Sequence, residues 1–223
     1  MKNTDSSARE TVMAHHKHIV ILADGDFPTN PHPLDLLSKA DTIVCCDNSI
    51  LKLVKNTNLD ADYIVGDMDT MSPENRLKYN EKITRIPDQE TNDLTKAFNF
   101  SLKLSPSRIT ILGATGARED HALANISLLS DYQQQFPNIE LVTDHGIFTA
   151  HTDTFTLEST PGQQVSIFAF DPTVKIKSAG LVYPTDSVIF DSWWKATLNE
   201  ASSTQFTLTL NHPAKVLVFR TFA

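Results

Sequence analysis

This sequence of 223 residues has little cysteine and no excess of basic residues. Its only two cysteines, Cys45 and Cys46, are neighbours within an apolar run. We therefore expect buried, reduced thiols, which are typical of a cytoplasmic protein, and not a disulfide framework. With 19 Lys and Arg against 27 Asp and Glu, the formal net charge is −8. That charge argues against nucleic acid as a partner, because proteins that bind its phosphate backbone are usually basic.

Long hydrophobic runs are also missing. Nothing in the sequence approaches the roughly 20 consecutive apolar residues that span a bilayer, so we expect no membrane contact. The polar segment 1–17 lacks the apolar core of a signal peptide and is expected to be a flexible tail. The sequence does contain 40% hydrophobic residues, which is enough to bury a substantial core.

The first two-thirds of the sequence alternates apolar runs with segments of helical spacing. The apolar runs, which predict strands, are 18–24, 41–48, 61–67, 107–115 and 139–146. The segments that predict helices are 34–40, 49–57, 72–80, 93–104 and 120–136. This alternation predicts an α/β domain over residues 18–147, with a Rossmann-like parallel sheet covered on both faces.

The last third has a different pattern. From about residue 147 onward, short runs rich in Thr, Val, Ile and Phe are separated by turn sequences such as "TPGQ" and "NHP". In "QFTLTL", Phe206, Leu208 and Leu210 alternate with polar residues and would share one face of a strand. The pattern predicts antiparallel strands in a β-sandwich domain over residues 148–223.

Acidic residues, glycines and one asparagine follow the predicted strands, where open α/β sheets bind their ligands. They are Asp24, Gly25 and Asp26; Asp47 and Asn48; Gly66, Asp67 and Asp69; and Gly113 and Gly116. Crowded carboxylates resist ionisation unless a cation joins them. Oxygen ligands beside an anion-binding loop suit Mg²⁺ that carries a polyphosphate. On an extended backbone Asp67 and Asp69 would point the same way and could bind one metal ion or two close ones. The alternative is an acidic turn before a helix capped by Ser72.

Two further segments carry candidate site residues. Asp93 and Lys96, three residues apart, would share a helix face as metal ligand and phosphate contact, or form an ordinary exposed ion pair. In "GATGAREDH", 113–121, a glycine turn leads into a helix whose N-terminal amides could bind phosphate. Arg118 adds a guanidinium fork for phosphate oxygens. His121 is either a site residue or a helix-start or core histidine, and Asn125 could face the same cleft.

Three segments in order resemble the signatures of the thiamine pyrophosphokinase family. "GDMDT" (66–70) resembles its GD-x-DS loop, "DQETNDLTK" (88–96) its DQ-x-x-TD-x-x-K segment, and "GATGAREDH" its G-x-x-G-x-R-x-DH loop. "SAGLVYPTD" (178–186) and "ATLNEASS" (196–203) resemble segments of that family's β-sandwich. The chain departs from the family pattern at three positions. Thr70 replaces the usual Ser and keeps a hydroxyl. Asn92 replaces the usual Thr or Ser, and Leu198 replaces a common Ser.

The resemblance implies a role for each matching residue. Asp67, Asp69 and Asp93 would bind Mg²⁺, and Asp47 beside them would position the metal-bound water or the substrate. Lys96 and Arg118 would contact the phosphates of ATP. Gln89 would hold substrate or nucleotide, and Asp120 and His121 would shape the loop between nucleotide and thiamine. Gly25, Thr115 and Gly116 complete the predicted nucleotide-binding set. The family forms homodimers in which the partner subunit's second domain completes the thiamine site. Trp193 and Trp194 would stack on an aromatic ligand or pack at the domain junction.

The implied reaction is transfer of the diphosphoryl group of ATP to the hydroxyl of thiamine, which gives thiamine diphosphate and AMP. Asp93 or Asp47 would accept the hydroxyl proton. Two other functions use similar residues: a metal-dependent phosphohydrolase, and a non-catalytic sensor of thiamine or nucleotide. A sensor needs binding groups but not the full charge set, so the joint presence of the aspartates, Lys96 and Arg118 favours catalysis.

Overall fold

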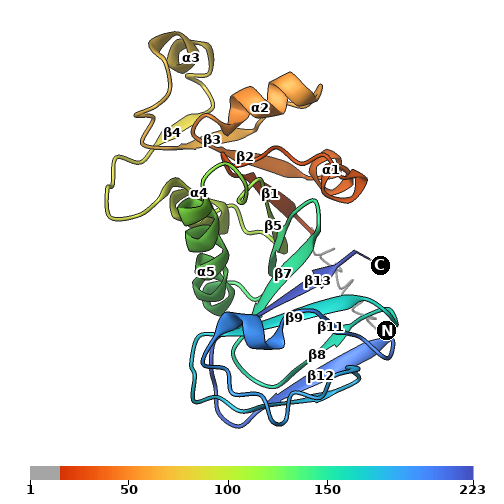
Figure 1. Cartoon of the computed structure of the whole chain (residues 1–223). Helices are drawn as coiled ribbons and strands as arrows, with labels where there is room; N and C mark the ends of the chain where they lie inside the picture. Colours follow the sequence, from red (N-terminus) through yellow and green to blue (C-terminus); the bar gives the residue numbers. More distant parts are fainter. Residues whose placement is uncertain (1–15, 223) are drawn as a thin grey trace, which may run out of the picture.

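A computed structural model describes residues 16–222 of the chain. The predicted tail, residues 1–17, therefore lies almost entirely outside the described residues. Within the described part, a ten-stranded sheet has the strand order β11-β9-β13-β7-β6-β5-β1-β2-β3-β4, and a second sheet has the order β10-β12-β8 (Figure 1). None of the helices in residues 16–222 is long and apolar enough to cross a membrane.

Six of the ten strands of the large sheet run parallel, as the alternating pattern predicts. They are β1 (His18–Leu22), β2 (Thr42–Cys46), β3 (Tyr63–Gly66), β4 (Ile83–Arg85), β5 (Arg108–Leu112) and β6 (Ile139–Val142). Between them lie α1 (Pro31–Ser38), α2 (Ser49–Asn56), α3 (Pro73–Lys78), α4 (Asp93–Leu102) and α5 (Glu119–Gln135). The α/β prediction is confirmed. Strand β4, a three-residue edge strand, was not predicted.

Residues of β1 alternate between two hydrophobic clusters, one on each face of the sheet. Ile19 and Ile21 pack with residues of α4 and α5, whereas Val20 and Leu22 pack with residues of α1 and α2. All four are fully or almost fully buried. This arrangement explains the near-continuous apolar runs, since each strand needs apolar side chains on both faces.

Capping residues fix where the helices begin. Ser72 accepts a hydrogen bond from Asn75 N (3.2 Å) and precedes Pro73, so α3 starts where the sequence predicts. Asn92 caps α4 in the same way, accepting from Thr95 N at 2.9 Å. Asp93 is therefore the first residue of α4, at the helix end where a negative charge is favourable.

The C-terminal strands are antiparallel, which confirms the predicted β-sandwich. Strand β7 (Gly146–His151) pairs with β6, and β13 (Val216–Thr221), β9 (Gln164–Ala169) and β11 (Asn199–Glu200) continue the same large sheet. Strands β8 (Phe155–Glu158), β10 (Ile176–Ala179) and β12 (Gln205–Leu210) form the second sheet. Phe206 and Leu208 are buried in the core of this region with Val165, Ile167 and Val216. The α/β layer and the sandwich thus share one continuous sheet (Figure 1).

Candidate functional site

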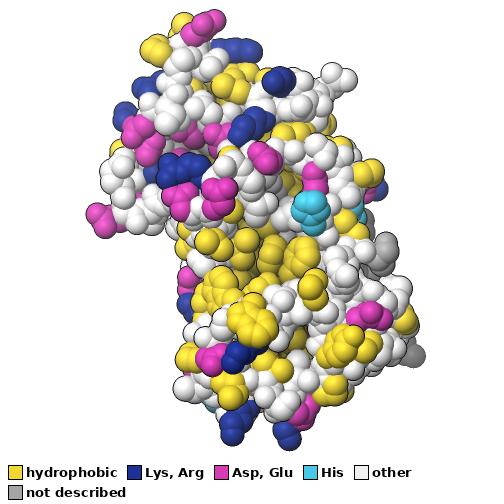
Figure 2. All heavy atoms as spheres, in the orientation of Figure 1, with side chains coloured by type: hydrophobic (Ala, Val, Ile, Leu, Met, Phe, Trp, Pro, Cys, Tyr) yellow, Lys and Arg dark blue, Asp and Glu magenta, His cyan; other side chains and the backbone are white. Residues whose placement is uncertain are grey.

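A pocket of about 450 Å³ lies at the carboxyl ends of the parallel strands. It is lined by nine of the twelve predicted site residues: Gly25, Asp47, Asp67, Asp69, Asp93, Lys96, Gly116, Arg118 and His121. Of the other three, Gln89 is hydrogen-bonded to Asp67, Asp120 is paired with Arg118, and Thr115 lines a neighbouring pocket of about 220 Å³. In Figure 2, acidic and basic side chains gather around the hollowed upper part of the molecule.

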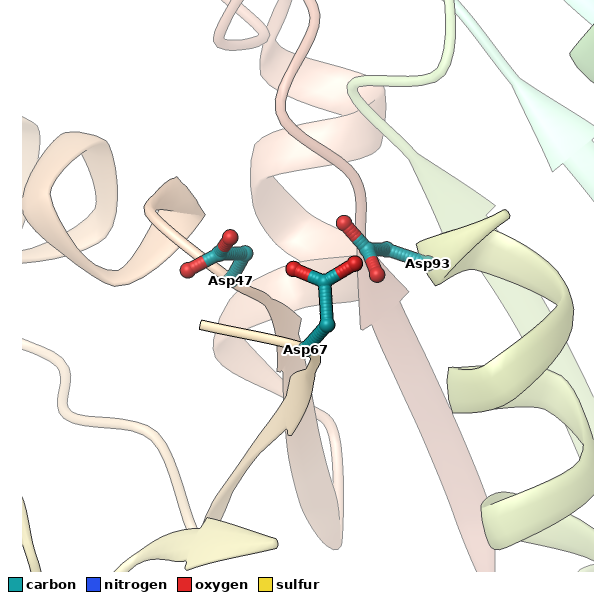
Figure 3. A group of neighbouring side chains, drawn as sticks. All are labelled: Asp47, Asp67 and Asp93. Atoms are coloured by element: carbon teal, nitrogen blue, oxygen red, sulfur yellow. The ribbon is translucent and has the colours of Figure 1, made fainter. Parts of the chain in front are cut away.

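Three carboxylates meet in this pocket. Asp47 follows β2, Asp67 follows β3 and Asp93 begins α4, and each offers an oxygen such that all three oxygens lie within 4.8 Å of one another. Figure 3 shows the three side chains converging from these separate elements. Such a set of hard oxygen donors is suited to a divalent cation such as Mg²⁺.

Asp69 is placed differently from the expectation that it would point the same way as Asp67. That expectation required an extended backbone, but Met68 has a φ of 64° with its side chain buried, so the chain turns there. Asp69 is exposed at the pocket, and its backbone N–H donates to Asp67 Oδ1 at 3.0 Å. The structure therefore brings Asp47, and not Asp69, into the group of three.

Lys96 is buried among these acids. Its side chain is 2% exposed, and Nζ lies 3.2 Å from Asp67 Oδ2 and 3.1 Å from Asp93 Oδ1. Burial alone would lower the pKa of Lys96, but the bonds and charges of Asp93 and Asp67 raise it above its usual value. Lys96 therefore carries its positive charge at neutral pH, and the alternative of an ordinary exposed ion pair is wrong.

Asp47 is the most buried of the three acids, with 5% of its surface exposed. Its Oδ2 accepts a hydrogen bond from Thr70 Oγ at 3.0 Å, whereas its buried Oδ1 has no partner among residues 16–222. Burial raises the pKa of Asp47, and the negative charges of Asp93 and Asp67 add to that effect. A proton or a cation at Oδ1 would relieve this cost.

Asp67 has the opposite electrostatic environment. The backbone N–H of Asp69, the ammonium of Lys96 and the side-chain amide of Gln89 all donate to its carboxylate, and they lower its pKa. These contacts favour the ionised form of Asp67.

The loops after β1 and β5 are joined by backbone hydrogen bonds. Gly25 N donates to Gly113 O at 2.7 Å, and Asp26 N donates to Thr115 O at 2.9 Å. A Cβ on Gly25 would lie 2.4 Å from Thr115 O, so only glycine allows this approach. Gly116 has a φ of 76° and directs the chain toward α5. The two loops thus form one wall of the pocket.

The remaining predicted residues lie at the start of α5. Arg118 is 69% exposed and forms an ion pair with Asp120, which raises the pKa of Arg118 and lowers that of Asp120. His121 is exposed and lines the pocket, which rules out a core histidine. Asn125, one turn later, lines the pocket too and donates to Ala114 O at 2.9 Å.

Lys52 supports one wall of the pocket, and sequence reasoning missed it. Its Nζ donates to the carbonyl oxygens of Asp24 (2.6 Å) and Gly25 (2.7 Å) and pairs with Asp24 Oδ1 at 2.8 Å. The residue lies in the middle of α2, where a lysine looks like an ordinary surface residue. The sequence did hold one signal for a role of Lys52 at the pocket. Lys52 lies one helical turn after Asn48, and α2 begins at the pocket.

The candidate aromatic residues lie in the C-terminal region, in the 3₁₀ helix η1 (Trp193–Ala196). Trp193 packs edge-on against Phe168 and Phe170 and donates from Nε1 to Ala169 O at 3.2 Å. Trp194 is 71% exposed. Leu198 has a φ of 58° and lines a separate pocket of about 340 Å³ with Tyr183 and Asn199.

Two family models match most of the chain. One, described as "Thiamin pyrophosphokinase, catalytic domain", matches residues 34–142. The other, described as "Thiamin pyrophosphokinase, substrate-binding domain", matches residues 146–219. The α/β region and the C-terminal β region therefore each match one domain of the same family.

Curated proteins and solved structures with related sequences or folds carry consistent names. "Thiamin pyrophosphokinase 1" of Caenorhabditis elegans is 24% identical over 77% of this chain and 76% of its own length. "Thiamine pyrophosphokinase 1" of rice, Oryza sativa subsp. japonica, is 36% identical over 36% of this chain, and the match spans about a third (33%) of the rice protein. The crystal structure of the Geobacillus thermodenitrificans thiamin pyrophosphokinase has a TM-score of 0.74 at 21% identity, covering 92% of this chain and 98% of that one. The Candida albicans thiamin pyrophosphokinase has a TM-score of 0.69 at 19% identity, covering 93% of both chains.

Proposed function

The chain belongs to the thiamine pyrophosphokinase family, and we propose that it transfers the diphosphoryl group of ATP to thiamine, giving thiamine diphosphate and AMP. The observation that carries this proposal is the convergence of the carboxylates of Asp47, Asp67 and Asp93, of which Asp67 and Asp93 also pair with the buried ammonium of Lys96. The arrangement lies beside a glycine loop at the start of a helix, where backbone amides favour phosphate. The pocket thus combines groups for a metal ion and groups for an anion.

Mg²⁺ is the proposed metal, and the donor set fits it. Three carboxylates converge, and the buried Oδ1 of Asp47 has no hydrogen-bond partner in the described chain. We propose Asp47, Asp67 and Asp93 as the residues that would hold the ion, with Asp69 at the pocket margin. When bound, Mg²⁺ would neutralise charge on the phosphate oxygens and help to align the transferred group.

Diphosphoryl transfer requires in-line positioning and charge neutralisation more than covalent chemistry from the protein. The oxygen of the thiamine hydroxyl forms a bond to the β-phosphorus, and the bond from that phosphorus to the α–β bridging oxygen breaks. The hydroxyl proton passes to a carboxylate oxygen of Asp93 or Asp47. Lys96 and Arg118 balance negative charge on the phosphates. Breaking the ion pair between Arg118 and Asp120 would free the Arg118 guanidinium to contact the phosphates. Gly25, Thr115, Gly116 and Gln89 shape the nucleotide side, and Asp120 and His121 the side facing thiamine.

We further propose that residues 148–223 bind thiamine and that the site is completed in a homodimer. Exposed hydrophobic residues support this part of the proposal, since large exposed apolar patches mark binding surfaces. Six of the nine exposed large hydrophobic residues in 16–222 lie between positions 182 and 198: Val182, Tyr183, Ile189, Trp193, Trp194 and Leu198. Figure 2 shows hydrophobic side chains gathered on the middle and lower part of the same face. The buried free thiols of Cys45 and Cys46 support a reducing location such as the cytoplasm.

The direct test is incubation of the protein with thiamine, ATP and Mg²⁺, followed by chromatography of the products. We expect thiamine diphosphate and AMP in equal amounts. Asp67→Asn should lower turnover by at least about 100-fold, because metal and phosphate-site groups contribute on this scale. Glu74→Gln, which removes an exposed carboxylate of α3, is the matched control and should keep the wild-type rate.

Two other results would contradict the proposal. ADP or free phosphate formed while thiamine stays unchanged would indicate a phosphohydrolase. Saturable thiamine binding by calorimetry without any turnover would indicate a sensor.

A further inference from the structure

The two oxygens of the Asp47 carboxylate have different environments. Oδ2 accepts a hydrogen bond from Thr70 Oγ at 3.0 Å. Oδ1 is buried and without a partner in the described chain. A carboxylate that was free to rotate about its Cβ–Cγ bond would not keep its two oxygens distinct. The contact from Thr70 therefore selects one orientation, in which Oδ1 is left for another group.

The hydrogen bond to Asp47 has a defined direction because of Asn48. Its side-chain amide donates from Nδ2 to Thr70 Oγ at 2.8 Å. An amide nitrogen cannot accept, so the Thr70 oxygen is the acceptor there and its single proton is available for Asp47. The chain Asn48–Thr70–Asp47 runs in one direction, and such chains strengthen each of their bonds.

The hydrogen-bonded chain Asn48–Thr70–Asp47, called the relay below, forms at the cost of a helix cap and of favourable backbone conformations. Asn48 is the N-cap residue of α2, a position where Asn usually accepts from an amide of the first turn, but its side chain makes no such bond to the described helix. Asp47 has a φ of 41° and Met68 a φ of 64°, so the backbone is in the left-handed region on both sides of the Thr70 contact. Strain of this kind is often concentrated at functional sites.

We propose that Thr70, held by Asn48, is a positioning residue that orients Asp47 so that Oδ1 can bind a divalent cation together with Asp67 and Asp93. This inference rests on the proposed metal site. Groups that orient metal ligands typically change metal affinity about 10- to 100-fold when removed. A threonine that merely joined the loops after β2 and β3 would affect stability and leave metal affinity unchanged.

The test measures Mn²⁺ binding to the purified full chain by electron paramagnetic resonance, without nucleotide or thiamine. Thr70→Val removes the hydroxyl at constant size and should weaken Mn²⁺ binding roughly 10- to 100-fold. Thr70→Ser restores the hydroxyl and should bind within about two-fold of wild type. The matched control is Thr91→Val, at another pocket-lining threonine, whose hydroxyl donates to Asp88 and not to the cluster. If Thr70→Val does not fold, Asn48→Ala tests the same chain and should weaken binding to a smaller extent.

The outcomes separate this inference from the metal site itself. If Asp67→Asn abolishes Mn²⁺ binding while Thr70→Val binds like wild type, the relay is wrong and the metal site remains. If Asp67→Asn also binds like wild type, the cluster does not hold the metal, and both the relay and the metal part of the proposed function are overturned.

Discussion

The ammonium group of Lys96 lies between the carboxylates of Asp67 and Asp93, at 3.2 and 3.1 Å. A lysine so deeply buried is costly unless its charge is compensated. Here the compensation is mutual, because Lys96 lowers the repulsion among three converging acids. The same residue therefore serves the stability of the free protein and, in the proposed reaction, the charge balance of the phosphates.

Lys96→Met should separate these two roles. We expect turnover to fall about 100- to 1,000-fold, the range seen when one preorganised electrostatic contact is removed. Without Mg²⁺ the free energy of unfolding should fall by about 1–3 kcal/mol, less than for a fully buried pair because Asp67 and Asp93 are partly exposed. Urea denaturation with and without Mg²⁺ measures this, and added Mg²⁺ should restore part of the loss.

Lys103→Met is the control for that experiment, since Lys103 is an exposed lysine that follows the same helix. It should change neither rate nor stability. Equal turnover of Lys96→Met and wild type would remove Lys96 from the phosphate site.

At the scale of elements, the loop after β1 is fastened from two sides. Its backbone bonds to the loop after β5 through Gly25 and Asp26, and Lys52 of α2 binds the carbonyl oxygens of Asp24 and Gly25. Lys52 also neutralises Asp24, which otherwise would present another negative charge to a polyphosphate in the pocket. Helix α2 thus positions a wall of the pocket from its second turn.

Lys52→Met should therefore raise KM for ATP about 3- to 10-fold while kcat and KM for thiamine change less, as expected for the loss of a few partly exposed polar contacts. Steady-state kinetics with each substrate varied in turn gives these values. Lys55→Met, at an exposed lysine three residues further along α2, should behave like wild type. A kcat defect with unchanged KM for ATP would contradict a role in shaping the nucleotide wall.

Much of this arrangement follows from the sequence, and the exceptions have physical reasons. Asp47 and Asp67 were expected at the pocket because each ends an apolar run, and Asp93 because it shares a helix face with Lys96 in a segment that resembles a family signature. In the group of three, Asp47 stands where Asp69 was expected. The chain turns at Met68, which has a left-handed backbone and a buried side chain, and a left-handed methionine has no signature in the local sequence. Edge strand β4 was missed because three residues of mixed polarity carry no periodic signal.

At the scale of the whole molecule, strand register joins the two regions in a way that the sequence does not predict. Strand β13, from the end of the chain, lies between β7 and β9, and β7 pairs with β6 of the parallel half. Short apolar runs predict that antiparallel strands exist, but partner choice depends on contacts between distant residues. Ala150 of β7 and Leu217 of β13 pack into the hydrophobic cluster of α4 and α5, so the two regions also share a core.

A half-buried histidine at this junction makes stability depend on pH. His151 of β7 stacks on Phe155 with ring centroids 3.7 Å apart, and its Nε2 lies 3.1 Å from Thr149 Oγ. Burial, assisted by the charge of Arg220, lowers the pKa of His151 to about 4. Between pH 4 and the usual histidine pKa of about 6.5, the unfolded state therefore binds more protons than the folded state at this site.

The contribution of His151 is thus complete above about pH 6.5 and is lost as the pH falls toward 4. We expect the free energy of unfolding to drop by about 1–3 kcal/mol over this window, and to drop less in His151→Gln, which cannot titrate. His18, half-buried beside Thr110, also has a lowered pKa. The free energy of unfolding of His151→Gln should therefore still depend on pH, but with a smaller slope. Urea denaturation at half-unit pH steps measures the difference, with His145→Gln at an exposed histidine as control. Identical slopes for His151→Gln and wild type would mean that His151 is accessible to protons in the folded protein, and that the sheet opens at β7 more readily than its packing indicates.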